Sequence, residues 1–201
     1  MKTNDITITA VESKELAQKT AYSILFSISF AHLLNDLLQA VIPSVYPILK
    51  DNFNLSFTQI GLITFSYQMA ASILQPFVGF YTDKNPKPFS QLYGMLFTIA
   101  GIVVLSYAAN FYLILLAVVL VGIGSSIFHP ESSRVSYLAS GGKRGLAQSI
   151  FQIGGNAGTA IGPLLVAIFV VPKSQLYILW FLIFAIIAMF VLSKIAFWYR
   201  D

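Results

Sequence analysis

The chain has 201 residues, of which 57% are hydrophobic and 10% are charged, and its mean hydropathy is +0.76. A soluble domain of this length rarely tolerates such a composition, so we predict an all-α, polytopic membrane protein. The net charge of +4 does not indicate nucleic-acid binding. Almost all of the charges lie in short segments between apolar runs, where they report membrane topology.

The residue inventory also excludes several kinds of site. Cysteine is absent, which excludes disulfides and cysteine-ligated metal. The two histidines, His32 and His129, lie far apart in the sequence, so we predict no zinc site, no other metal and no cofactor. No nucleophile lies at a recognisable spacing from a base, and we do not expect an enzyme.

Six apolar segments organise the chain. Residues 1–20 are polar and of mixed charge without a short apolar core, so we predict a cytoplasmic tail and not a signal peptide. Residues 21–201 form the predicted six-helix transmembrane domain. Each span is near or above the ~20 residues needed to cross ~30 Å of hydrocarbon. The predicted spans are residues 21–49, 56–81, 89–109, 111–136, 146–171 and 175–198.

The basic residues indicate the orientation. If the tail is inside, ten of them lie on the inner side: Lys2, Lys14, Lys19, Lys84, Lys87, Arg134, Lys143, Arg144, Lys194 and Arg200. Only Lys50 and Lys173 lie on the outer side. Because cytoplasmic segments carry the excess of Lys and Arg, we predict a multi-pass protein of the cell membrane with both termini cytoplasmic.

The first span carries a polar face near its middle. At about 100° per residue, four polar side chains fall within about 100° of one another: His32, Asn35, Asp36 and Gln39. His32 and Asp36 are spaced i,i+4, so they can share a proton or a charge. A buried carboxylate is costly in a bilayer and is usually functional. The alternative is a polar pair that only fastens helices together.

The fourth span combines two polar features on one helix. One stripe comprises Gly122, Ser125, His129, Ser133 and Ser136. Glu131 and Arg134 lie on roughly the opposite side, three residues apart, and we predict that they form an ion pair. We expect His129 to lie near the plane of His32 and Asp36. The alternative for this helix is attachment to its neighbours through serine hydroxyls.

The second and fifth spans also carry regular stripes. In the second span the stripe fits either a pore wall or close helix packing: Gly61, Thr64, Gln68, Ser72, Gln75 and Gly79. The fifth span separates the two roles. One face bears Gln148, Gln152, Asn156 and Thr159, which can line water or substrate. Another face bears Gly154, Gly158 and Gly162, whose spacing permits close approach of a second helix.

Two motifs resemble signatures of the major facilitator superfamily. Residues 79–88, Gly-Phe-Tyr-Thr-Asp-Lys-Asn-Pro-Lys-Pro, resemble its G-x-x-x-D-[RK]-x-G-R-[RK] signature. Gly79, Asp83, Lys84 and Lys87 match that pattern, whereas Pro86 and Pro88 depart from it. Gly158, Gly162 and Pro163 match the G-x-x-x-G-P core of the antiporter signature. The arginine that many members carry in the fourth span is replaced by Val118, which leaves open which residues handle protons.

Within that superfamily the chain resembles the fosmidomycin-resistance-type exporters. The resemblance is carried by three segments: His32-Leu-Leu-Asn-Asp36, Phe128-His-Pro-Glu-Ser-Ser-Arg134 and Phe151-Gln-Ile-Gly-Gly-Asn156. It implies proton-driven export of a small toxic compound, in the type case an anionic phosphonate antibiotic. It also implies twelve spans in two six-helix bundles, each built from inverted three-helix repeats. This chain then corresponds to the N-terminal half, and its partner is the C-terminal half or a second copy.

We therefore interpret the polar residues as parts of a transporter. Asp36 and His32 are the predicted proton-coupling pair. The predicted substrate-binding residues are His129, Asn35, Gln39, Gln68, Gln152 and Asn156. Two alternatives stay open: a proton-coupled importer of a metabolite, and a non-transporting or truncated membrane subunit.

Overall fold

The computed structural model describes residues 20–200, in which helices joined by short turns are the regular structure and no strand occurs. The predicted tail therefore lies outside the described residues except for Thr20. The elements are α2 (Tyr22–Ser44), α3 (Tyr46–Phe53), α4 (Phe57–Lys84), α5 (Ser90–Ser106), α6 (Phe111–Leu138), α7 (Arg144–Phe169), the 3₁₀ helix η1 (Gln175–Phe181) and α8 (Leu182–Arg200).

These elements correspond to the six predicted spans. The first span is α2 followed directly by α3, with a break at Val45 that lies between Pro43 and Pro47. Pro47 has no backbone N–H to donate to the carbonyl of Pro43 four residues earlier, and this missing helical hydrogen bond accounts for the break. The last span is η1 continued by α8. Four segments, residues 22–53, 111–138, 144–169 and 175–200, are long and apolar enough to cross a membrane by length and composition, while α5 is a shorter apolar helix of 17 residues.

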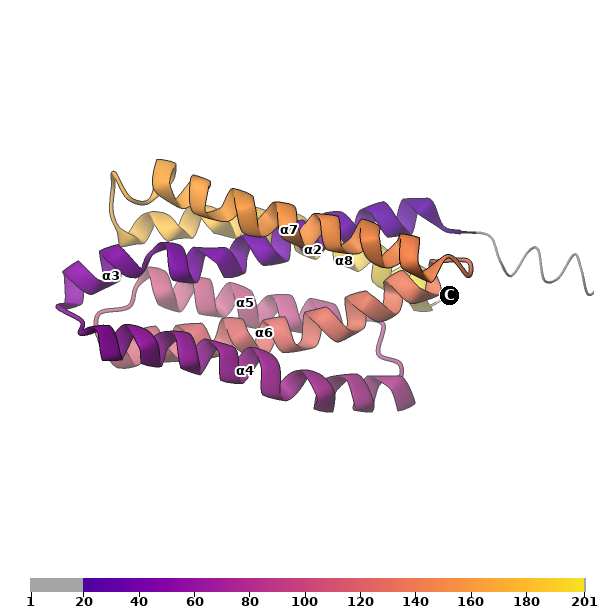
Figure 1. Cartoon of the computed structure of the whole chain (residues 1–201), viewed down its shortest axis with the longest axis horizontal. Coiled ribbons are helices and arrows are strands. Elements are labelled where there is room, and N and C mark those ends of the chain that lie inside the picture. Colours follow the sequence, from indigo (N-terminus) through magenta and orange to yellow (C-terminus); the bar gives the residue numbers. More distant parts are fainter. Residues whose placement is uncertain (1–19, 201) are drawn as a thin grey trace, which may run out of the picture.

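The packing pairs helices from the two halves of the chain. α2 packs mainly against α7 and also against α8, while α6 packs against both α4 and α5. The first helix of each three-helix set thus contacts the second helix of the other set, as inverted three-helix repeats require. Figure 1 shows α7 and α4 at opposite edges of the bundle, and the start of α2 at the same end as the C-terminus.

A glycine ridge on α7 allows it to lie directly against α2. A Cβ atom on Gly154 would overlap the backbone carbonyl of Ser29, and one on Gly158 would overlap that of Leu33. A Cβ atom on Gly162 would lie 2.7 Å from the Cβ of Ala40. The prediction that these glycines permit close helix approach is confirmed. The contact fixes the height of α7 relative to α2.

Gly158→Ala should therefore destabilise the bundle. The added methyl group has no space beside the Leu33 carbonyl, and overpacking of this kind costs roughly 1–3 kcal/mol. The midpoint of thermal unfolding, measured in detergent on the complete protein, should fall. Gly145→Ala on the same helix is the matched control, because nothing lies within 4 Å of its added Cβ. Equal midpoints for the two variants would contradict the close-packing argument.

Candidate functional site

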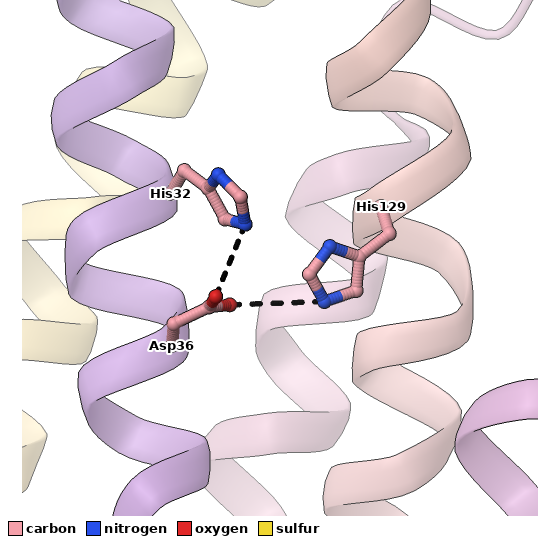
Figure 2. A group of neighbouring side chains, drawn as sticks. All are labelled: His32, Asp36 and His129. Carbon is pink, nitrogen blue, oxygen red and sulfur yellow. Dashed lines mark ion pairs between the residues drawn. The ribbon is translucent and has the colours of Figure 1, made fainter. Parts of the chain in front are cut away.

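Asp36 lies between the two histidines of the chain. Its Oδ2 is 3.1 Å from Nε2 of His32 on the same helix, and its Oδ1 is 3.7 Å from Nε2 of His129 on α6. Figure 2 shows the three side chains directed toward one another from the two helices. The placement of His129 near His32 and Asp36 is confirmed. Histidines that are distant in the sequence therefore meet at one carboxylate.

The backbone of α7 fixes the tautomer of His32. Its Nδ1 lies 2.9 Å from the carbonyl oxygen of Phe151, and the ring stacks on the Phe151 ring with centroids 3.9 Å apart. A carbonyl oxygen only accepts, so Nδ1 carries a hydrogen and donates it. In a neutral ring Nε2 is then an acceptor. Because it faces a carboxylate oxygen, a further proton or another cation is needed between Nε2 and Oδ2.

The side-chain amides of Asn35 and Gln39 both contact Oδ1 of Asp36. Nδ2 of Asn35 donates to Oδ1 of Asp36 at 3.1 Å, and Nε2 of Gln39 lies 3.4 Å from the same oxygen. Gln39 Nε2 is also 3.4 Å from Nε2 of His129. The Gln39 oxygen accepts hydrogen bonds from the Tyr67 hydroxyl and, at 3.1 Å, from the Ser125 hydroxyl. Gln39 thus links α2, α4 and α6 at the level of Asp36.

Asp36 borders two hollows. One has a volume of about 550 Å³ and is lined by His32, Asp36, His129, Ser133, Gln148, Ser149, Phe151 and Gln152. The other has a volume of about 190 Å³ and is lined by Asp36, Gln39, Ala40, Pro43, Tyr67 and Thr159. The first extends toward the turn between α6 and α7, and the second toward the end of α2. The carboxylate therefore forms part of the wall of both hollows.

The remaining predicted binding residues are distributed unevenly around these hollows. Gln152 lines the larger one and donates to Oδ1 of Asn156 at 3.1 Å. Gln148 donates to the Ser133 hydroxyl at 2.7 Å and so joins α7 to α6 across that cavity. Gln68 is exposed on α4 and lines neither hollow. The adjacent Tyr67 takes its place.

Sequence reasoning missed three contributors to the site. Phe151 supplies the carbonyl and the ring that hold His32, and Tyr67 supplies a hydroxyl to Gln39. A Cβ atom on Gly155 would lie 2.6 Å from His32 Nε2 and 2.7 Å from Asp36 Oδ2, so only glycine leaves room for that pair. The doubled glycine at 154 and 155 was the available signal, because only Gly154 belongs to the glycine ridge of α7 that packs against α2.

A second polar cluster joins the C-terminal end of α4 to α6. Arg134 lies 3.4 Å from Oδ1 of Asp83 and donates to the backbone carbonyl of Thr82. The predicted ion pair between Arg134 and Glu131 is wrong. The end of α4 offers unpaired carbonyls and the negative end of a helix dipole together with Asp83, and these attract the guanidinium. Glu131 is 1% exposed, and its Oε1 has no hydrogen-bond partner among residues 20–200.

The other motif residues lie near that cluster or on α7. A Cβ atom on Gly79 would lie 3.6 Å from the Cβ of Pro130, so α4 and α6 are close there. The Lys84 ammonium lies 4.0 Å from the centroid of the Phe80 ring. Lys87 lines a small hollow at the start of α5. Pro163 lies inside α7 on its exposed side.

Comparison with known proteins identifies the kind of bundle in which this site lies. The sequence pattern of the Major Facilitator Superfamily matches residues 28–201. The chain belongs to the Major Facilitator Superfamily. The predicted resemblance and the predicted fold are thereby confirmed. In secondary transporters built from such repeats, substrate and coupling-ion sites lie near the membrane midplane at the interface between repeats.

Two relatives match most of this superfamily chain. The fosmidomycin resistance protein of Escherichia coli (strain K12) is 52% identical over 181 residues, which make up 90% of this chain and 45% of that protein. YfnC of Bacillus subtilis (strain 168), an uncharacterized MFS-type transporter, is 49% identical over 182 residues, which make up 90% of this chain and 44% of that protein. The chain thus spans slightly less than half the length of either relative.

Proposed function

We propose that the chain is the N-terminal bundle of a proton-coupled antiporter that exports a small toxic compound. Membership of the Major Facilitator Superfamily supports transport of a small molecule across a bilayer. The likeness to a fosmidomycin resistance protein supports export of a compound such as a phosphonate antibiotic. The partner of this bundle is a C-terminal six-helix half or a second copy.

The contact between His32 and Asp36 carries the proton-coupling proposal. With Nδ1 bound to the Phe151 carbonyl, the 3.1 Å approach of Nε2 to Oδ2 favours a proton held between two acceptors. Asp36 also borders both hollows, through which that proton can be exchanged. Asp36 and His32 are therefore the proposed coupling residues.

The larger hollow supports the substrate part of the proposal. His129 contributes a half-buried imidazole to it, while Gln148, Gln152 and Ser133 contribute amides and a hydroxyl. These groups can donate hydrogen bonds to an anion such as a phosphonate, and a protonated His129 adds charge to that contact. Asn35, Gln39 and Asn156 complete the proposed binding set by holding the carboxylate, His129 and Gln152 in place.

Transport driven by an imposed pH gradient tests this function against its alternatives. In liposomes that contain the complete protein, an antiporter should accumulate labelled fosmidomycin when the lumen is more acidic than the outside, because protons leave as substrate enters. An ionophore that collapses the gradient is the control. Accumulation only with an acidic outside would indicate a proton-coupled importer. A lack of accumulation with either gradient would contradict transport of this compound.

The orientation gives a separate prediction. We expect a reporter fused after Asp201 to be cytoplasmic and a reporter inserted at Asn110, between α5 and α6, to be external. The physical reason is the excess of Lys and Arg at the ends of the helices that adjoin the tail, the α4–α5 turn and the α6–α7 turn. Paired alkaline phosphatase and fluorescent-protein fusions measure both positions. An external C-terminal reporter would overturn the proposed topology in the cell membrane.

A further inference from the structure

We propose that His32, Asp36 and His129 form a binding site for a divalent transition-metal ion of the zinc type. One ligand atom from each residue can be chosen so that all three lie within 4.8 Å of one another. Figure 2 shows both imidazoles presenting a ring nitrogen to the carboxylate. The site extends beyond the proposed function, because binding of a metal ion does not depend on proton-coupled transport.

The distances from the two imidazoles to the Asp36 carboxylate are near those of tetrahedral coordination. Ligand atoms about 2.0–2.1 Å from a zinc ion lie about 3.3 Å apart at tetrahedral angles. His32 Nε2 is 3.1 Å from Oδ2 of Asp36 and His129 Nε2 is 3.7 Å from Oδ1, and with one oxygen as the ligand the three atoms lie within 4.8 Å of one another. Closing the site requires the ligand atoms to move closer together, and the His129 ring has room to move because its side chain is 27% exposed. Its 3.4 Å contact with Gln39 is long and is readily replaced.

His32 is oriented in the way that a metal-binding histidine usually is. Metal-ligating imidazoles donate their other ring N–H to a carbonyl or carboxylate, which fixes the tautomer and directs the free lone pair at the ion. Nδ1 of His32 donates to the Phe151 carbonyl at 2.9 Å, and the stacked Phe151 ring holds its plane. The lone pair on Nε2 then faces an anionic oxygen. A cation between these two atoms satisfies both.

The ligand set and the cavity determine the class of ion. Two imidazoles and one carboxylate suit zinc, cobalt and nickel, whereas calcium and magnesium prefer oxygen ligands alone. Three protein ligands leave the fourth position open, as in zinc sites that bind water or substrate. The hollow of about 550 Å³ beside the three residues has room for that fourth ligand. The carboxylate leaves a bound dication with a net positive charge, so the fourth ligand should be water or an anion.

Binding of Co²⁺ to the complete gene product in lipid nanodiscs tests the site directly. We expect one Co²⁺ per chain with the intense visible absorption of tetrahedral cobalt, and displacement of that ion by Zn²⁺. We expect the affinity for Co²⁺ to fall by at least about 10-fold in each of three variants, Asp36→Asn, His32→Gln and His129→Gln. A loss of about 10-fold is the lower end of the effect seen when a residue that only hydrogen-bonds to a metal ligand is replaced. Ser149→Ala is the matched control, because Ser149 lines the same hollow but donates to the Gly145 carbonyl of its own helix.

A cysteine variant separates coordination from folding. Residues 1–201 contain no cysteine, so His129→Cys introduces a new thiolate at the site. If residue 129 is a ligand, the Co²⁺ form of this variant should gain a sulfur-to-cobalt charge-transfer band that the parent protein lacks. Three results would overturn the proposal. They are a lack of Co²⁺ binding, a spectrum typical of octahedral cobalt, and a Co²⁺ affinity that none of the three substitutions changes. The spectra do not involve transport, so failure of proton coupling would leave this result intact, and failure of metal binding would not affect the gradient assay.

Discussion

Asp36→Asn should abolish proton-driven transport by the complete protein while leaving its membrane insertion intact. Asparagine keeps the size of the side chain, and its amide can donate to Nε2 of His32 in place of the shared proton. The contact that holds the pair together is then preserved, at the 3.1 Å separation seen for the native pair. An amide cannot take up and release a proton. The coupling step is therefore lost without a large structural cost.

The measurement is substrate accumulation in liposomes under an imposed pH gradient. We expect accumulation by the Asp36→Asn variant to fall to the level of protein-free liposomes. Asp51→Asn is the matched control, because Asp51 is an exposed carboxylate on α3 and undergoes the same chemical change. Equal yields and elution volumes of the two variants exclude misfolding as the cause. Wild-type accumulation by Asp36→Asn would remove Asp36 from the coupling mechanism.

The number of helices and their approximate bounds are predictable from the sequence. Each span is a long apolar run between short charged or glycine-containing connections, and the bilayer allows such a run few structures besides a helix. The break at Val45 is harder to predict. Pro43 and Pro47 mark the place where helical hydrogen bonds are lost. Whether the helix only bends there or is broken into two helices depends on its packing against neighbouring helices.

The site is predictable only in part. The i,i+4 spacing of His32 and Asp36 places them together on any helix, and the structure has them in contact. The contact of His129 with Asp36 depends on the height of α6 relative to α2, for which the sequence supplies only a polar stripe. The role of Gln39 depends on side-chain orientation, because its amide joins groups from three helices. No periodicity encodes such a junction.

The incorrect pairing of Arg134 has a similar origin. The i,i+3 spacing considers only partners on the same helix, and it makes Glu131 the natural neighbour. In the folded bundle, the end of α4 supplies a carbonyl and a second carboxylate to the same guanidinium. Tertiary contacts therefore decide which carboxylate Arg134 meets, and they leave Glu131 buried and outside that pair.

Residues 1–201 expressed alone should not transport. The cavity at Asp36 is formed by α2, α4, α6 and α7, and the same face leaves polar side chains uncovered, including Gln152 and Asn156. Asp36 is 16% exposed and His129 is 27% exposed, so an isolated bundle presents both to lipid. Each charged group at the bilayer centre costs about 2.5–3.5 kcal/mol on insertion scales. The isolated bundle should therefore pair with a second copy through this face or be degraded.

Crosslinking together with a transport assay distinguishes these outcomes. A single cysteine at Asn156, exposed beside the cavity, should form a disulfide-linked dimer if two copies cover the polar face. A cysteine at Ile187, exposed on α8, should not form one, because that surface is apolar and is already stable in lipid. A short half-life and no crosslink would indicate degradation. Both dimer formation and degradation agree with the prediction, provided that the liposomes do not accumulate fosmidomycin. The prediction would be wrong if a demonstrably monomeric six-helix chain accumulated fosmidomycin under a pH gradient at the rate of the complete protein in parallel liposomes. One bundle would then suffice for transport.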